Sequence, residues 1–359
     1  LVLDHGKYIM GPEVKELEDK LAAYVGVKHC IAVSSGTDAL LVALMALGIE
    51  PGDEVITTPF SFFATAETIL LLGAKPVFVD IEKKTYNLNP DNIKSAITRR
   101  TKAIMPVSIY GQPANFEKIN KIAKDFEIPV IEDGAQSFGS KHNNLKSCGL
   151  STIGTTSFFP SKPLGCYGDG GACFTNDDSL ANAMRQISSH GQEKRYKHNK
   201  IGLNGRLDTL QAGVLLSKIK IFDKEVKLRE TIGKKYTNKL NQLGFTNTPF
   251  VELNNNSVYA QYTVQIENRS RVMNYLKEKG IPTTIHYPSL MSDQDALNNK
   301  KGFFAKILRR KIYKAYSLKI AQNLVEKVLS LPMHPLLNEN DQDLIIDSLI
   351  SANKKINKS

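Results

Sequence analysis

The chain lacks long apolar stretches, and its few cysteines and histidines show no regular spacing. No apolar run in the 359 residues approaches the about 20 residues that a membrane-spanning helix needs. No basic, apolar leader precedes the fold, and because the chain opens on Leu1 rather than Met we expect a short N-terminal piece to be missing. Neither a zinc motif nor a disulfide framework fits the four cysteines or the seven histidines. We therefore expect no metal, no membrane partner and a cytoplasmic location.

The formal net charge of +11 raises the question of nucleic-acid binding. No recognisable nucleic-acid module accompanies the excess lysines, which are scattered and more frequent in the C-terminal third. A surface that favours anionic ligands explains the charge more simply, and we expect no nucleic-acid partner. With 42% hydrophobic and 23% charged residues the composition is that of an ordinary globular protein, long enough for one large and one smaller domain.

Alternating short β-branched runs and helical periodicity between residues 26 and 172 predict βα units and a mainly parallel sheet. Strands are expected at 30–33, 54–57, 75–80, 103–108 and 130–132, and helices at 39–44, 64–72, 90–98 and 116–126. A long helix at 209–242 leads to a strand at 258–266 and helices at 270–279 and 341–352. The prediction is an α/β protein: a large domain, 1–230, with its sheet sandwiched by helices, and a smaller C-terminal α/β domain, 231–359.

A carboxylate and an amine stand where two predicted strands end. Asp133 directly follows the apolar run at 130–132, and Lys162 follows a strand pattern at 155–159 and precedes a glycine-dense loop. Ligands collect at the carboxyl ends of parallel strands, so both side chains can face one crevice. Pyridoxal phosphate chemistry uses such a pair, the amine for a Schiff base and the carboxylate beside the pyridine nitrogen. Taken singly, Asp133 also suits a helix N-cap and Lys162 a solvated loop.

Two further strand–helix loops carry groups suited to binding. Ser35-Gly36-Thr37 joins a strand to a helix, and the amides of such a turn form an anion site, although turns of this composition are common. Phe60, Phe62 and Phe63 lie on the next loop. Aromatic residues there are usually part of the core, but one of them can stack on a planar ring.

Seven motifs, ordered along nearly the whole chain, carry a family resemblance. They are GTDAL at 36–40, PGDEVI at 51–56, GAKPV at 73–77, IEDGAQ at 131–136, SFFPSK at 157–162, GLNGRLD at 202–208 and IHYP at 285–288. With these motifs the chain resembles the DegT/DnrJ/EryC1/StrS sugar aminotransferases, pyridoxal phosphate enzymes with the type I aminotransferase fold. The resemblance therefore implies that fold, that cofactor and transaminase activity.

Matching motifs imply roles for the cofactor-binding residues. Lys162 would be the Schiff-base lysine and proton shuttle, and Asp133 would hold the pyridinium proton. The remaining cofactor contacts implied by the family are Gln136 to the ring hydroxyl, Phe62 stacking on the ring, Gly36, Thr37 and Ser157 to the phosphate, and Asn204 to the phosphate of the neighbouring subunit.

The resemblance also implies a homodimer with shared sites. Arg206, His286 and Tyr287 match residues that form the family's substrate pocket across the dimer interface. From the residues alone, Arg206 can equally be a surface ion-pair partner, and His286 and Tyr287 before Pro288 can be a packed strand end.

Four further motifs are similar to one branch, the bacterial UDP-2-acetamido-2-deoxy-3-oxo-glucuronate aminotransferases. They are YNL at 86–88, CYGDGG at 166–171, HGQ at 190–192 and SVYAQY at 257–262. That branch implies transfer from L-glutamate to the 3-keto carbon of a UDP-sugar, for bacterial surface glycans of the O-antigen type. The alternatives are amination of a dTDP-linked 3-keto-6-deoxyhexose and a non-catalytic regulator that keeps the cofactor site. Lys162 argues against the family's dehydratases, which carry histidine there.

Overall fold

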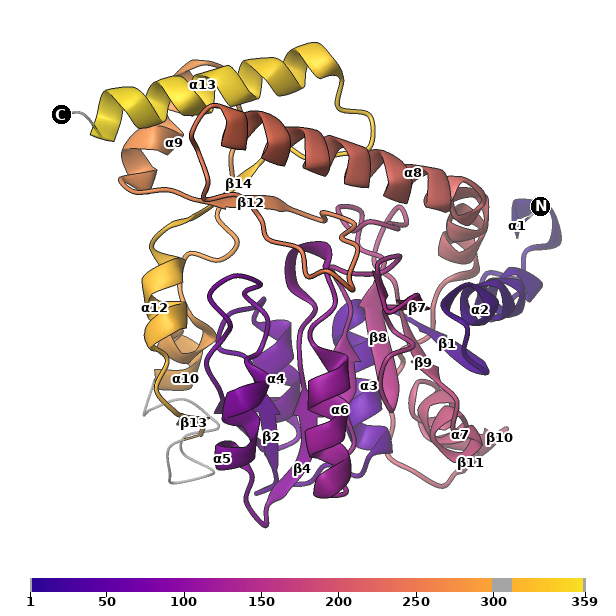
Figure 1. Ribbon diagram of the computed structural model, residues 1–359. Helices are drawn as coiled ribbons and strands as arrows, with labels where there is room; N and C mark the ends of the chain where they lie inside the picture. The colour runs from indigo at the N-terminus through magenta and orange to yellow at the C-terminus, as the bar shows by residue number, and fades with distance from the viewer. Residues whose placement is uncertain (1, 299–311, 358–359) are drawn as a thin grey trace.

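A central sheet of eight strands organises the molecule, a computed structural model that describes residues 2–298 and 312–357 (Figure 1). One half has the order β1 (His29–Val33), β9 (Gly171–Thr175), β8 (Ile153–Ser157), β5 (Ile131–Asp133), and the other has the order β4 (Thr101–Met105), β2 (Glu54–Thr57), β3 (Lys75–Phe78), β13 (Lys314–Ala315). Parallel bridges from Ile104 to Val130 and from Val107 to Asp133 join the halves. Because β9 alone runs antiparallel to its neighbours, the expected mainly parallel sheet is confirmed.

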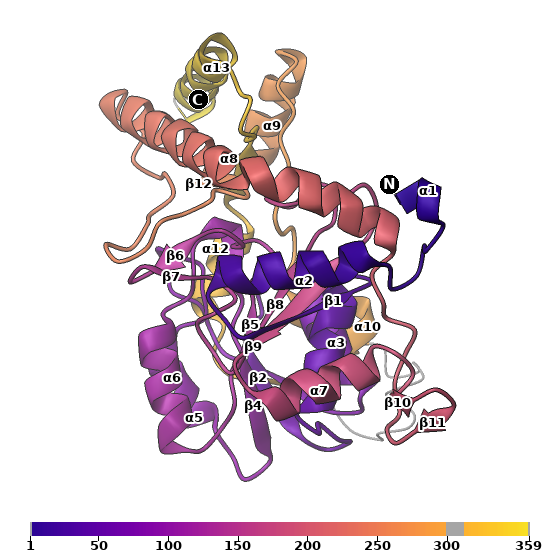
Figure 2. The same ribbon diagram turned by 90° about the vertical axis from the view of Figure 1, so that its right-hand side faces the viewer.

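Helices cover both faces of this sheet. In β1, Ile31 packs with α3 (Gly36–Ala46), α4 (Ala64–Leu71) and α7 (Asp178–Ile187), whereas the next residue, Ala32, packs with α2 (Pro12–Val25) and the first half of α8 (Thr209–Gln242). This alternation follows from the two-residue period of a strand. Figure 2 shows α2 and α8 side by side along one face. Beside β4, α6 (Phe116–Asp125) and the short helix α5 (Ile93–Ala96), which follows η1 (Pro90–Asn92), pack in a further core of this sheet.

The C-terminal layer has a core of its own. Strand β12 (Tyr262–Gln265) pairs antiparallel with β14 (Val328–Leu331), and α9 (Arg269–Glu278) and α13 (Glu339–Asn357) pack there with the last turns of α8. Along α8, Phe222 and Val226 belong to the large core, whereas Ile232 and Tyr236 belong to the C-terminal one. We therefore keep the division at 230/231 as a proposal. The exception is α12 (Lys319–Val325), which with β13 packs against the large domain.

The strand expected at 258–266 is wrong in its first half. It begins only at Tyr262, because Tyr259 has a left-handed φ of 41° and its N–H bonds to the Ser257 hydroxyl instead of a neighbouring strand. Strand β12 is therefore four residues long.

Residues 2–298 and 312–357 contain neither a membrane-spanning helix nor a cluster of metal-ligating side chains. No helix there combines the length and the apolar character needed to cross a bilayer. No group of three histidine, cysteine, aspartate or glutamate side chains is arranged there to hold a metal ion.

Candidate active site

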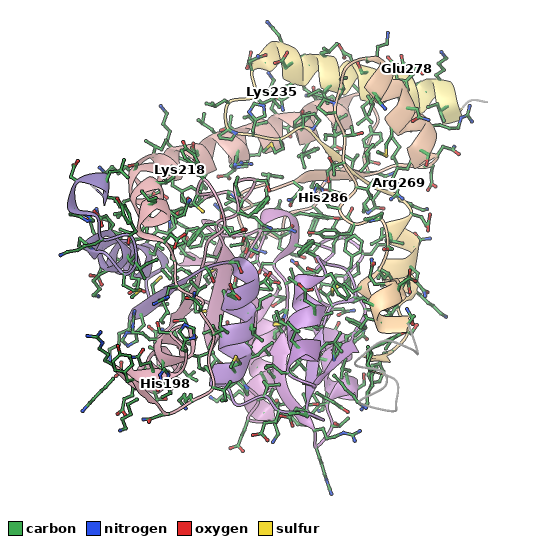
Figure 3. The ribbon with its side chains drawn as sticks, turned by 180° about the vertical axis from the view of Figure 1, so that it is seen from behind. His198, Lys218, Lys235, Arg269, Glu278 and His286 are labelled. Carbon is green, nitrogen blue, oxygen red and sulfur yellow. The ribbon has the colours of Figure 1, made fainter. Side chains whose placement is uncertain are left out.

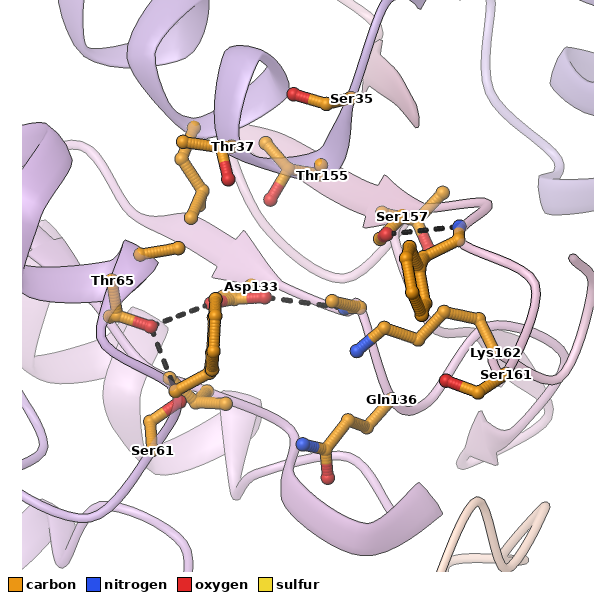
Figure 4. Close-up of a pocket in the computed structure, with 18 of the residues that line it drawn as sticks. Ser35, Thr37, Ser61, Thr65, Asp133, Gln136, Thr155, Ser157, Ser161 and Lys162 are labelled. Carbon is orange, nitrogen blue, oxygen red and sulfur yellow. Dashed lines mark hydrogen bonds between the residues drawn. The ribbon is translucent and has the colours of Figure 1, made fainter. Parts of the chain in front are cut away.

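A cavity of about 510 Å³ opens where β5 and β8 end and where α3 and α4 begin (Figure 4). This is the edge at which parallel α/β sheets bind ligands. The cavity collects most of the residues singled out from the sequence, namely Gly36, Thr37, Phe62, Asp133, Gln136, Ser157, Lys162, His286 and Tyr287. Asn204 and Arg206 do not line it.

Lys162 occupies the turn that follows β8. Its backbone N–H donates to the carbonyl of Phe159 at 2.9 Å, and its amine points into the cavity between Asp133 and Gln136 (Figure 4). Burial lowers the pKa of Lys162, while the negative charge of Asp133 acts in the opposite direction. The amine is thus easier to deprotonate than a solvated one, which suits a nucleophile and a base.

Asp133 ends β5 and is only 5% exposed. Its Oδ2 accepts a hydrogen bond from the Thr65 hydroxyl at 3.0 Å, and its Oδ1 accepts one from the N–H of Ala135 at 3.2 Å. Burial raises the pKa of Asp133, whereas these two donors and Lys162 favour the charged form. No helix of the described chain begins at Asp133, so the carboxylate is not a helix cap but a fixed anion facing the cavity.

The turn between β1 and α3 forms a cradle for an anion. Ser35 caps α3 by accepting the N–H of Asp38 at 3.0 Å, and the first turn of the helix, with Thr37, faces the cavity (Figure 4). A Cβ on Gly36 would lie 2.5 Å from Cβ of Ser157, so only glycine lets this turn touch the end of β8. A helix N-terminus flanked by hydroxyls is a phosphate site.

Aromatic side chains and one imidazole form another part of the cavity wall. Phe62 is 59% exposed, and its ring centre lies 6.3 Å from that of Tyr287. Gln136 donates from Nε2 to the Tyr287 hydroxyl at 2.9 Å and accepts at Oε1 from the N–H of Tyr110 at 2.7 Å. Burial raises the pKa of Tyr287 far above neutrality, so its hydroxyl keeps its proton.

His286 joins this wall from the C-terminal layer (Figure 3). Its Nδ1 lies 2.9 Å from the Ser330 hydroxyl in β14. Burial and the nearby Lys162 charge lower its pKa, so the ring is neutral at pH 7. The two layers of the molecule therefore close the cavity together.

Asn204 and Arg206 lie on a segment that is hydrogen-bonded to the β1–α3 turn. The guanidinium of Arg206 donates twice to Oδ1 of Asn204, at 3.1 and 2.8 Å, and the carbonyl of Gly205 accepts the N–H of Ser34. Both side chains are therefore held together near the phosphate cradle but outside this chain's own cavity.

Sequence reasoning missed the support for Asp133 and one wall of the cavity. Ser61 lies within 3.2 Å of the Thr65 hydroxyl, which in turn donates to Asp133. Their four-residue spacing was visible, but only the fold shows that it faces a carboxylate. Gln261 lines the cavity as well, from the segment before β12.

The residues present fit pyridoxal phosphate. A buried amine, a fixed carboxylate, an anion cradle that a Cβ would fill and an exposed aromatic ring surround one cavity. These are the groups that bind its aldehyde, ring nitrogen, phosphate and ring face.

Solved structures agree with this arrangement. The chain superposes on a DegT/DnrJ/EryC1/StrS aminotransferase from Brucella abortus with a TM-score of 0.90 and 40% identity, covering 98% of this chain and 93% of the other. It superposes on NtdA from Bacillus subtilis with bound cofactor PMP with a TM-score of 0.89 and 32% identity, covering 98% and 80%. The fold and the site define a pyridoxal-phosphate-dependent aminotransferase.

The chain belongs to the DegT/DnrJ/EryC1/StrS aminotransferase family, whose model matches residues 1–350. A relative from Pseudomonas aeruginosa, UDP-2-acetamido-2-deoxy-3-oxo-D-glucuronate aminotransferase, is 54% identical over 97% of this chain and 93% of its own. A Geobacillus stearothermophilus pleiotropic regulatory protein is 41% identical over 97% and 91%. A Streptomyces venezuelae dTDP-3-amino-3,4,6-trideoxy-alpha-D-glucose transaminase is 34% identical over 97% and 89%.

Proposed function

We propose that this enzyme moves an amino group from L-glutamate to the 3-keto carbon of a UDP-linked 2-acetamido-2-deoxy-3-oxo-hexuronate. The product would serve bacterial surface glycans of the O-antigen type. The observation that carries the reaction type is the cavity holding both Lys162 and Asp133. The choice of sugar is supported by the 54% identity to the Pseudomonas aeruginosa enzyme over 97% of the chain.

The cofactor-facing residues of the cavity have defined tasks in this reaction. The bound cofactor supplies an electron sink for the carbon that loses a proton. Lys162 would hold the cofactor through Nζ, and its free amine would act as the base that moves a proton at the substrate carbon. Asp133 would hold a proton on the ring nitrogen. Burial raises the pKa of Asp133, and the hydrogen bonds from Thr65 and the Ala135 N–H favour its charged form against that effect. Gln136 binds the ring hydroxyl, and Phe62 covers the ring.

The remaining residues place the phosphate and the substrates. Gly36, Thr37 and Ser157 bind the phosphate at the start of α3. His286 and Tyr287 bind the substrate from the C-terminal layer. Glutamate leaves as 2-oxoglutarate before the keto-sugar enters, so one cavity of about 510 Å³ serves both substrates in turn.

A homodimer completes the proposed site. Asn204 and Arg206 are fixed to one another outside the cavity of their own chain, a placement suited to contacting a neighbour's site. In a dimer Asn204 reaches the neighbour's phosphate, and the planar guanidinium of Arg206 binds a carboxylate of the donor or of the uronate. Four free, buried cysteines fit the reducing cytoplasm, where nucleotide sugars are the expected partners.

Lys162→Ala tests the reaction type. The variant loses the amine that holds the cofactor, so we expect the absorbance band of lysine-bound cofactor and steady-state turnover to disappear. Spectra and coupled glutamate assays measure both. Lys141→Ala, which changes an exposed lysine of β6 (Lys141–His142), is the control and should match the unmodified enzyme. Normal turnover by Lys162→Ala would refute the proposal.

Paired keto-sugar assays test the substrate. The unmodified enzyme should aminate the UDP-3-oxo-hexuronate with the higher kcat/KM, and a preference for a dTDP-3-keto-6-deoxyhexose would overturn the choice of sugar. Failure to form pyridoxamine phosphate when glutamate is added would instead indicate a regulator that keeps the fold.

A further inference from the structure

One residue of the cavity wall carries a buried polar atom without a hydrogen-bond partner. In the described residues, three buried side-chain nitrogen or oxygen atoms lack a hydrogen bond: Glu13 Oε2, Arg229 Nε and Gln261 Oε1. Among these three residues only Gln261 lines the cavity, where Lys162, His286 and Tyr287 also face. Buried polar atoms are nearly always hydrogen-bonded, so an unpaired oxygen on a residue of the cavity wall is a group that a donor on a bound ligand would satisfy.

The backbone that carries Gln261 is firmly held. The N–H of Val258 donates to the carbonyl of Gly111 at 2.9 Å, and Arg229 donates to the carbonyl of Tyr259 at 3.3 Å. A Cβ on Gly111 would lie 2.6 Å from the nitrogen of Tyr259, so the two segments are in close contact.

The residue after Gln261 is equally fixed. Tyr262 is fully buried, stacks on Tyr236 with ring centres 4.6 Å apart and begins β12. A side chain fixed on such a backbone remains at the cavity wall, and its amide is thus preorganised for a ligand.

The chemistry of an amide oxygen selects between the two substrates. It accepts hydrogen bonds. The carboxylates of glutamate only accept them at neutral pH, and the amino group of glutamate is engaged in displacing Lys162 from the cofactor. A sugar hydroxyl or an acetamido N–H can donate. We propose that Gln261 determines specificity for the amino acceptor, with its Oε1 accepting a hydrogen bond from a hydroxyl or amide N–H of the keto-sugar. This inference rests on the proposed function, because it takes the acceptor to be such a sugar.

Gln261→Leu tests the proposal through the two half-reactions measured separately. The glutamate half-reaction should stay within about twofold of the unmodified rate, while KM for the sugar and the Kd of the aminated sugar, measured by calorimetry, should rise about 10- to 100-fold. The control is Gln265→Leu in β12, which removes a hydrogen bond from Nε2 to the Tyr86 hydroxyl and no group of the cavity wall. Gln265→Leu should change neither the KM for the sugar nor the Kd of the aminated sugar.

Sugar analogues identify which group of the sugar donates the hydrogen bond to Gln261. One aminated sugar lacks the 4-hydroxyl and another carries oxygen in place of the acetamido N–H. The unmodified enzyme should bind one of them more weakly, and Gln261→Leu should show no further loss with that analogue. Unchanged sugar constants in Gln261→Leu, or equal slowing of both half-reactions, would overturn the proposal.

Folding and substrate choice are checked independently. If melting curves show that Gln261→Leu does not fold, the unbranched Gln261→Met variant decides the same comparison. If the unmodified enzyme rejects the uronate but aminates another keto-sugar, the proposed function fails. The Gln261 experiment is then run with the sugar that is accepted.

Discussion

At the scale of single residues, two adjacent carboxyl groups on β5 have different environments. Asp133 faces the cavity, whereas Glu132 points into a closed network behind it. Oε1 of Glu132 accepts hydrogen bonds from the hydroxyls of Ser147 and Ser108 at 2.6 and 3.3 Å, and Oε2 accepts the N–H of Cys148 at 2.8 Å. Burial outweighs these donors and raises the pKa of Glu132 from 4.5 to about 7.

Because the pKa of Glu132 is raised, we expect the free energy of unfolding to decrease as pH rises. Between about 4.5 and about 7 the unfolded chain has lost a proton that the folded chain retains, so the free energy of unfolding decreases as pH rises, by at most about 1.4 kcal/mol per pH unit. In Glu132→Gln this decrease should disappear. Urea unfolding at pH 5, 6, 7 and 8 measures it, with Glu117→Gln on exposed α6 surface as the control. An unchanged pH slope in Glu132→Gln would contradict the prediction.

At the scale of elements, contact between the β1–α3 turn and the end of β8 shapes the phosphate cradle. Gly36→Ala places a methyl group 2.5 Å from Ser157 Cβ, so the two elements must separate. We expect the cofactor to dissociate about tenfold or more readily, because its phosphate loses aligned amides. Gly213→Ala in α8 is the matched control, because a Cβ there would lie no closer than 3.6 Å to any neighbouring atom. Equal cofactor affinity in both variants, measured by fluorescence titration, would exclude this role.

The sequence predicts some of these elements and site residues but not others. Buried apolar runs predicted β1 to β5, and the ends of β5 and β8 predicted Asp133 and Lys162, because a strand's direction fixes where its last side chain lies. The left-handed backbone at Tyr259 depends on contact with Gly111, which is distant in the chain, so periodicity could not predict it. Thr65 and Gln261 were missed for the same reason: they reach the site through tertiary packing.

At the scale of the whole molecule, one surface segment lies next to the phosphate cradle. Asn204 and Arg206 are hydrogen-bonded to each other there, and Tyr196 and Ile201 in the same stretch are 81% and 85% exposed. Large exposed apolar side chains beside a polar pair suit contact with another protein surface. We therefore expect this segment to lie in the dimer interface and to complete the neighbouring site.

Mixing two inactive variants tests sharing of sites between subunits. Lys162→Ala loses the amine, and a variant carrying Asn204→Ala with Arg206→Ala loses the groups proposed to cross the interface. If each site takes Lys162 from one chain and Asn204 from the other, a heterodimer contains one intact site, and random mixing restores about a quarter of full activity. If each site lies within one chain, every site in the mixture is damaged and no activity returns. Co-expression with two affinity tags isolates the heterodimer, and its rate per cofactor decides between these arrangements.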